Sequence, residues 1–210
     1  MKKIFSLILI VVLLPAISFC QFYLEPFLGY QKDMNNFKIN FLNTGIQFAY
    51  KIKKYEILFQ LQKDWPGIRH GVDSSFTLNT SLPLYSPASK EISISSFACA
   101  IGNRVKMIGK NLGSCLFIKL YTGVMIEKAN ITYSYDKSNY TILNPDQTQD
   151  VTGFFVSIGL EYMWQFSNGR IFCDLNFSTP PWAKLNYPSS YNLLAPVSFN
   201  VGYSFQVSKK

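Results

Sequence analysis

The segment FFVSIGLEYMWQF, residues 154–166, alternates two kinds of side chain with a period of two. One register is apolar throughout, from Phe154 to Phe166, whereas the other holds small or polar residues and one carboxylate, Glu161. A period of two indicates a β-strand whose two faces meet different surroundings. What each face touches therefore decides which folds are open to this chain.

Similar alternation recurs along the chain, so that eight strands are predicted. Eight antiparallel strands favour a closed barrel, because closure removes the exposed sheet edges. The pattern in 90–105 assigns no faces, and we find no internal repeat and no second domain. The predicted strands are 21–31, 42–52, 55–62, 90–105, 116–127, 154–166, 171–178 and 197–207. Short links near 51–54, 106–113 and 167–170 alternate with longer ones near 32–40, 63–89, 128–151 and 179–195.

The composition of the polar faces favours a membrane barrel over a soluble, lipocalin-like barrel, which is the alternative. A face in water should carry many Lys and Glu, but here Ser, Gly, Asn and Gln dominate, and only 15% of the chain is charged. Aromatic residues end the apolar registers beside the short links, where an interfacial girdle would lie. We therefore predict an all-β fold: an eight-stranded antiparallel transmembrane up-and-down β-barrel with short periplasmic turns and long extracellular loops.

The N-terminus has the form of a secretory signal peptide. A basic MKK precedes the apolar run IFSLILIVVLL, which is too short to span a bilayer, and PAISFCQ follows. We predict a signal peptide over residues 1–20, cleaved between Cys20 and Gln21, and a barrel domain over 21–210. A lipoprotein acylated at Cys20 is the alternative. Three cysteines then remain, which gives no disulfide framework, and one histidine without a CxxC pair predicts no metal site and no cofactor.

The export signal, the eight strands, the alternation of link lengths and the late aromatic strand FNVGYSF resemble the small bacterial outer-membrane barrels of the OmpA and OmpX type. The CQ junction and the terminal GYSF are similar to barrel-domain proteins of Bacteroidetes-like bacteria. The resemblance implies a place in the outer membrane of a Gram-negative cell. It implies as partners outer-membrane lipid or lipopolysaccharide, the barrel-assembly machinery and a surface or secretion partner of the loops. No basic patch with a reading motif points to nucleic acid.

An eight-stranded barrel is just wide enough for side chains to fill, so a solute porin is not expected. A structural or interaction protein that acts through its extracellular loops is the first expectation. The alternatives are a lipid-modifying enzyme, such as a lipid A acyltransferase or deacylase, and an accessory of secretion or envelope assembly. The enzyme interpretation would use His70, Asp73 and Ser74, but a triad is defined by geometry and no second catalytic motif accompanies these residues.

Aromatic residues in the predicted long loops suit binding, since rigid aromatic side chains lose little entropy on contact. Membrane-interface anchoring is the alternative for the tryptophans. The candidates are Trp65, Trp182, Tyr187 and Tyr191.

The carboxylate of the opening segment predicts charge pairing inside the lumen. If Asn168-Gly169 forms a two-residue turn, Glu161 faces Asn176 and lies diagonal to Asp174. Two carboxylates in a narrow lumen repel each other and lose hydration, so they require a cation or a proton.

We expect Lys119 to supply that charge, with Glu25, Glu56 and Arg104 extending the cluster. The predicted role is a structural plug, and a gate or proton path is the alternative. Arg170 is grouped with the basic residues of the short turns, whose side chains we expect to snorkel towards water.

Overall fold

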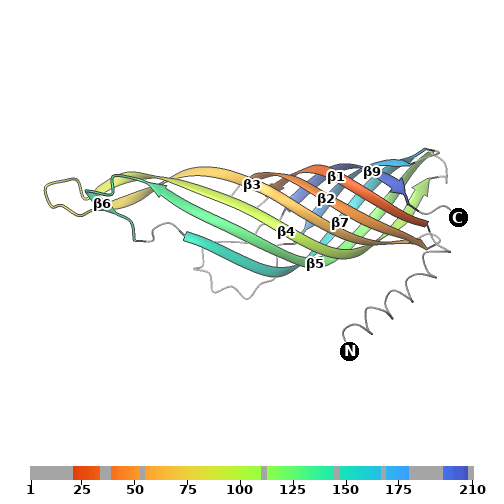
Figure 1. The fold of residues 1–210 in the computed structure, drawn as a ribbon. Helices are drawn as coiled ribbons and strands as arrows, with labels where there is room; N and C mark the ends of the chain where they lie inside the picture. Colours follow the sequence, from red (N-terminus) through yellow and green to blue (C-terminus); the bar gives the residue numbers. More distant parts are fainter. Residues whose placement is uncertain are drawn as a thin grey trace, which may run out of the picture.

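The computed structural model describes residues 21–33, 39–52, 55–109, 113–143, 147–166, 169–179 and 196–207. The predicted signal peptide and its cleavage site lie outside these ranges. The described chain is almost entirely antiparallel sheet, which closes on itself as a barrel (Figure 1). The ring consists of β1 (Gln21–Asp33), β2 (Asn40–Ile52), β3 (Tyr55–Thr77), β4 (Tyr85–Gly109), β5 (Gly113–Ser134), β7 (Gln147–Gln165), β8 (Arg170–Ser178) and β9 (Pro196–Gln206).

The ring closes because β9 pairs with β1, which places the first and last strands side by side. In the part of the chain that the structure describes, a short strand β6 (Tyr140–Thr141) pairs with the far end of β3 and with no other strand. The predicted eight-stranded, up-and-down barrel is therefore confirmed. Among the described residues, no helix has the length and apolar character of a membrane span.

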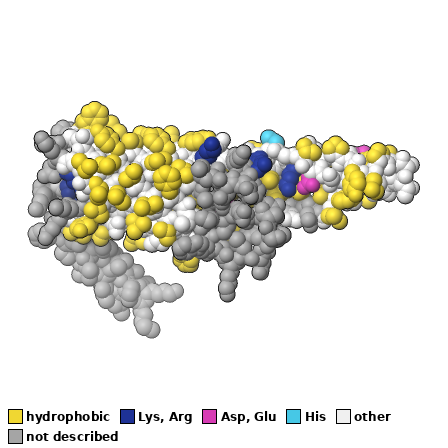
Figure 2. Space-filling view, turned by 180° about the vertical axis from the view of Figure 1, so that it is seen from behind, with side chains coloured by type: hydrophobic (Ala, Val, Ile, Leu, Met, Phe, Trp, Pro, Cys, Tyr) yellow, Lys and Arg dark blue, Asp and Glu magenta, His cyan; other side chains and the backbone are white. Residues whose placement is uncertain are grey.

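The two faces of the barrel are inverted relative to a water-soluble protein. Phe154 and Ile158 on the outer face of β7 are 64% and 56% exposed, whereas Glu161 on the inner face of the same strand is fully buried. Figure 2 shows hydrophobic side chains over the outer surface of the barrel. Aromatic pairs lie near the short-turn end of this surface, such as Trp164 and Phe166 with ring centroids 5.8 Å apart. This distribution fits a barrel in lipid and not the soluble alternative.

The faces of β4, which the sequence did not assign, follow from burial. Ala98, Ala100 and Arg104 point into the lumen, while Phe97 and Ile101 are exposed on the outer face. The pattern was ambiguous because apolar residues occupy both faces of this strand. Small alanines and a serine face the narrow lumen, and larger side chains cover the outside.

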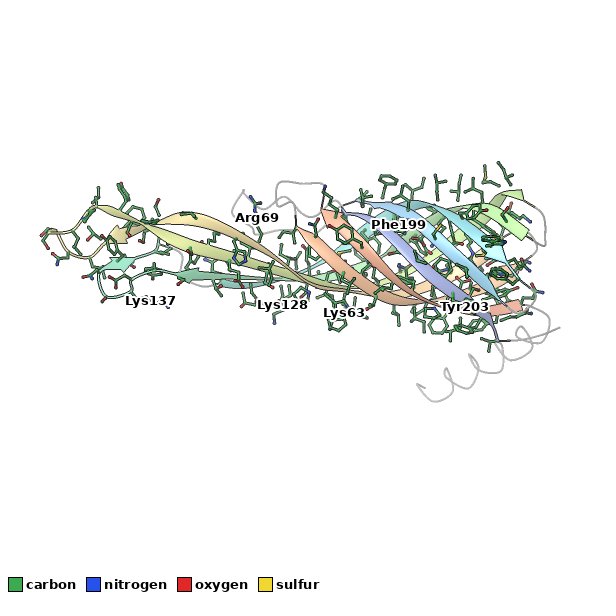
Figure 3. All side chains as sticks on the ribbon, turned by 90° about the horizontal axis from the view of Figure 1, so that it is seen from above. Lys63, Arg69, Lys128, Lys137, Phe199 and Tyr203 are labelled. Atoms are coloured by element: carbon green, nitrogen blue, oxygen red, sulfur yellow. The ribbon has the colours of Figure 1, made fainter. Side chains whose placement is uncertain are left out.

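Two of the predicted long loops, 63–89 and 128–151, are mostly strand, so that part of the prediction is wrong. β3 has 23 residues and β4 has 25, and they remain paired as far as Phe76 and Tyr85. Figures 1 and 3 show β3, β4 and β5 running on well beyond the barrel. Here both faces of the sheet meet solvent, so the alternation of apolar and polar side chains that indicates a strand is lost. Hydrogen bonding between backbones maintains the sheet without that pattern.

A β-bulge between Asp64 and Gly67 marks the junction between the barrel and this extended sheet. At the same level lies a cluster of buried apolar residues. A Cβ on Gly67 would overlap the side chain of Ile39, so glycine permits the close approach of β2 to β3. The cluster consists of Ile39, Phe41, Ile92, Ile94 and Ile131.

Two glycines give a matched test of how tightly the lumen is filled. A Cβ on Gly45 would overlap the ring of Phe27 and the carbonyl oxygen of Leu61, whereas nothing lies near the same position on Gly71. We expect Gly45→Ala to lower the free energy of unfolding in detergent micelles by about 1–3 kcal/mol through overpacking. Gly71→Ala should leave it unchanged or raise it slightly, since alanine orders a strand at a lower entropic cost. Equal stabilities for the two variants would contradict a filled lumen.

Candidate functional site: the charged lumen

A network of seven charged side chains crosses the inner half of the barrel, towards the end with the short turns. The inward face of each strand positions them, and each residue is at most 3% exposed. Six of the seven are the residues that the sequence placed in a lumen cluster. The network consists of Glu25 on β1, Glu56 on β3, Arg104 on β4, Lys119 on β5, Glu161 on β7, and Arg170 and Asp174 on β8.

Arg104 is the centre of this network and contacts three carboxylates from three other strands. Its guanidinium lies 2.7 Å from Glu25 Oε1, 2.5 Å from Glu56 Oε2 and 2.8 Å from Glu161 Oε1. The planar guanidinium presents five donors, so one arginine can satisfy several acceptors at once. Arg104 thus links β4 to β1, β3 and β7 across the lumen.

Lys119 and Arg170 complete the pairing of the carboxylates. Lys119 Nζ lies 2.9 Å from Glu161 Oε2 and 2.5 Å from Asp174 Oδ2, so Glu161 bridges Arg104 and Lys119. Arg170 Nη1 lies 3.0 Å from Glu56 Oε1. The four carboxylates therefore each contact at least one cation, which is the condition for keeping charges in a space closed to water.

The hairpin between β7 and β8 has a different register from the predicted one. Gln165 pairs with Arg170, and Glu161 pairs directly with Asp174. The predicted two-residue turn at Asn168-Gly169, which would place Glu161 opposite Asn176, is therefore wrong by two positions.

The contacts of Gly169 give the physical reason. A Cβ there would overlap the hydroxyl of Tyr203 and crowd the backbone of Ser204, so this glycine serves a close approach to β9. Its carbonyl oxygen accepts a hydrogen bond of 2.8 Å from the N–H of Phe166, as the last pair of the hairpin. A shift of two residues leaves every side chain on its face, so the alternation alone could not exclude it.

Arg170 is the charged member that the sequence interpretation missed. We expected it to snorkel from a short turn, but it is 2% exposed and its guanidinium stacks 3.5 Å from the ring centroid of Tyr23. The available signal was its register, because Arg170 alternates in step with Phe172 and Asp174 on the inward face.

The network continues through amide side chains towards the outer half of the lumen. Asp174 Oδ1 accepts hydrogen bonds from Asn176 Nδ2 at 2.6 Å and from Asn200 Nδ2 at 2.8 Å. On the opposite side, Gln47 joins the hydroxyl of Tyr121 to the carboxylate of Glu25. In the part of the chain that the structure describes, no group of three or more His, Cys, Asp and Glu side chains is arranged to hold a metal ion.

The candidate catalytic residues His70, Asp73 and Ser74 lie on β3 and do not form a triad. Successive residues of a strand point to opposite faces, so Asp73 lies on the other face from His70 and Ser74. His70 instead faces Glu91 at 3.7 Å, and Asp73 faces Lys90 at 3.6 Å. The geometry gives the enzyme interpretation no support.

Of the four aromatic residues proposed for loop binding, the structure describes only Trp65. It lies on β3 rather than in a loop, its Nε1 donates to Thr44 Oγ1 at 3.0 Å, and Lys63 Nζ lies 4.7 Å from its ring centroid. Trp182, Tyr187 and Tyr191 lie outside the described residues.

Comparisons with known proteins agree with this architecture. No family model and no curated protein sequence matches the chain. Among solved structures, a major outer membrane protein from Thermus thermophilus is similar, with a TM-score of 0.53 and 10% identity over 89% of this chain and 98% of that one. Neisserial surface protein A gives a TM-score of 0.49 and 10% identity over 88% and 96% of the two chains. The outer membrane protein OprG from Pseudomonas aeruginosa gives 0.46 and 12% over 90% and 97%.

The first of these similarities carries the argument for the fold, since its TM-score exceeds that of the other two. Together with the closed ring of strands and the apolar outer face, it defines the class of protein. This chain is a small, eight-stranded β-barrel with the architecture of an outer-membrane barrel.

The lumen network predicts which second substitution repairs the loss of a cation. Lys119→Met should lower the free energy of unfolding in micelles by about 3–5 kcal/mol, because it leaves buried carboxylate charge unpaired. Glu161 keeps its contact with Arg104, whereas Asp174 retains no cation among the described contacts. Lys119→Met with Asp174→Asn should therefore recover more stability than Lys119→Met with Glu161→Gln. Equal recovery, or none in either double variant, would show that the pairing is not as described.

Proposed function

We propose that this protein is an exported barrel of the bacterial outer membrane, with a closed lumen, that acts as an interaction protein through its extracellular side. The observation that carries the proposal is the strand extension. We define this extension as Trp65–Thr77 of β3, Tyr85–Ser95 of β4 and Lys128–Ser134 of β5, together with β6. It projects from the end of the barrel opposite to the start of β1 and the end of β9 (Figure 1).

The strand extension exposes more apolar surface than a solvated hairpin needs. Contiguous exposed apolar residues on a soluble surface are a common mark of a contact site. Val72 is 75% exposed, and Phe76 and Tyr85 form an aromatic pair at the tip with ring centroids 5.3 Å apart. Trp65 and Ile68 of the extension are also exposed, and so are Leu78, Leu84 and Leu143, which lie next to its strands.

The edge of β3 is a second feature of the extension that suits contact. Among the described residues, Gly67–Ser75 pairs with β4 on one side and with no strand on the other. A strand edge offers backbone donors and acceptors to an extended segment of another chain. Charged and polar side chains along it, such as Arg69 and His70, limit indiscriminate pairing.

The closed lumen is the second half of the proposal. An eight-stranded barrel is narrow, and here buried ion pairs fill its inner half while an apolar cluster lies across its outer end. These observations favour a structural plug over a gate or proton path. They also favour an interaction role over solute transport.

The alternatives have less support. A lipid-modifying enzyme would require catalytic groups, and His70, Asp73 and Ser74 are not brought together. A role in secretion or envelope assembly is compatible with the extension but has no observation of its own. Lys63 and Lys128, which Figure 3 labels, are exposed, and their positive charge suits contact with the phosphates of lipopolysaccharide.

Site-specific photocrosslinking in intact cells tests the interaction role. A photoreactive amino acid at Val72 should give adducts of defined mass, because this side chain is among the most exposed of the extension. The same amino acid at Leu160, on the outer face of the barrel and 49% exposed, is the matched control and should capture mainly lipid. Defined protein or polysaccharide adducts at Leu160 and none at Val72 would contradict the proposal.

A further inference from the structure

The end of the lumen at the short turns gathers three inward-facing cations, and we call this end the short-turn mouth. Lys51 near the end of β2, Lys106 near the end of β4 and Arg170 at the start of β8 alternate in step with buried residues of their strands. Lys51 and Lys106 are half-buried, whereas Arg170 is buried. Lys51 lies close enough to the other two for their charges to repel it.

The carboxylate of Glu56 faces these cations but is already engaged. Glu56 pairs directly with Lys51 in the sheet, yet its oxygens lie 2.5 Å from Arg104 and 3.0 Å from Arg170. Among the described residues, Lys51 forms no ion pair. The positive charge of Lys51 is therefore not balanced at contact distance.

Arg170 uses only part of its guanidinium. Its Nη1 contacts Glu56, and the ring of Tyr23 covers the guanidinium plane with its centroid 3.5 Å from Cζ. The hydroxyl of Tyr23 is also near, but it donates to Gln21 Oε1 at 2.9 Å. Nε and Nη2 are buried and have no hydrogen-bond acceptor among the described residues. This pair of donors is a side of the guanidinium that binds two oxygens of one anion.

A second buried group on the adjacent strand also lacks a partner. Ser204 pairs directly with Arg170 in the sheet and is fully buried, and its Oγ makes no hydrogen bond within the described part of the chain. Buried polar groups are rarely left without partners, and such gaps can mark the place of an ion. Unfilled donors beside unbalanced positive charge select an anion.

We propose that the short-turn mouth binds one phosphate group. The Nε and Nη2 atoms of Arg170 would hold two of its oxygens, Lys51 would balance its charge, and Lys106 would add to the positive field. Several cations around one site favour phosphate over a singly charged carboxylate. The same chemistry has two sources, a free phosphate ion and the headgroup of a phospholipid. The inward direction of these side chains favours the free ion, because lipid contacts the outer face.

Isothermal titration calorimetry of the refolded full chain in maltoside micelles tests the site, with sodium phosphate as the probe at constant ionic strength. The wild type should bind phosphate saturably, and Lys51→Met should weaken binding at least about tenfold, because a charge-assisted contact is lost. Lys137→Met removes the same charge from an exposed position away from the barrel (Figure 3) and should bind as the wild type does. No saturable binding in the wild type, or wild-type affinity in Lys51→Met, would overturn the proposal.

Arg170→Lys separates the geometry of the site from its charge. Lysine keeps a positive charge for Glu56 but lacks the planar pair of donors, so phosphate affinity should fall in this variant as well. Glu56 retains its contact with Arg104, so the variant leaves no carboxylate of the network without a cation. Wild-type phosphate affinity in Arg170→Lys would show that the guanidinium does not hold the anion and would overturn the proposal.

Competition with a short-chain phosphatidylglycerol distinguishes the two sources of the phosphate group. Displacement of phosphate by this lipid would assign the site to a headgroup, and its failure to displace would assign the site to the free ion. Crystals of the full chain soaked in tungstate, a tetrahedral oxyanion with strong anomalous scattering, test the site without any variant. A peak should lie within reach of Arg170 Nε and Lys51 Nζ, and water alone at that position would overturn the proposal.

Discussion

The contacts of Arg104 with Glu25, Glu56 and Glu161 hold the barrel together from the inside. The outer face of the barrel is apolar and suits lipid. The polar side chains of the barrel strands therefore face the lumen. A narrow lumen excludes most water, and each charge must then find its partner within a few ångströms. One guanidinium that reaches three other strands meets this condition, and it requires those strands to have a single register.

The same constraint explains how the barrel changes character along its length. Ion pairs line the half of the lumen near the short turns, and side-chain amides line the next layer. The apolar cluster around Ile39 and Phe41 lies at the outer end. The bulge between Asp64 and Gly67 lies at the last of these transitions. Beyond it the sheet has no lumen to enclose, so β3, β4 and β5 continue as an open, solvated sheet with exposed apolar residues.

The sequence predicted the fold because the apolar and polar registers have a strict period of two inside the barrel. It predicted Lys119 beside Glu161 because a lone carboxylate in an apolar strand requires a cation. It could not fix the register between Glu161 and Asp174, since a shift of two residues preserves both faces. The closeness of Arg170 to a turn suggests a solvated side chain, whereas its register with Phe172 and Asp174 places it in the lumen. The sequence does not indicate the strand extension, because strands solvated on both faces lose the alternation of apolar and polar side chains.

Recordings of the refolded protein in planar lipid bilayers test most directly whether the lumen is closed. Under the proposal of a closed lumen, the ion pairs around Arg104 and the apolar cluster at the outer end block the passage of water and ions. The wild-type protein should therefore show no steady conductance steps above those of detergent-only controls. Stable steps in the nanosiemens range, of the size that a water-filled barrel gives, would contradict that account.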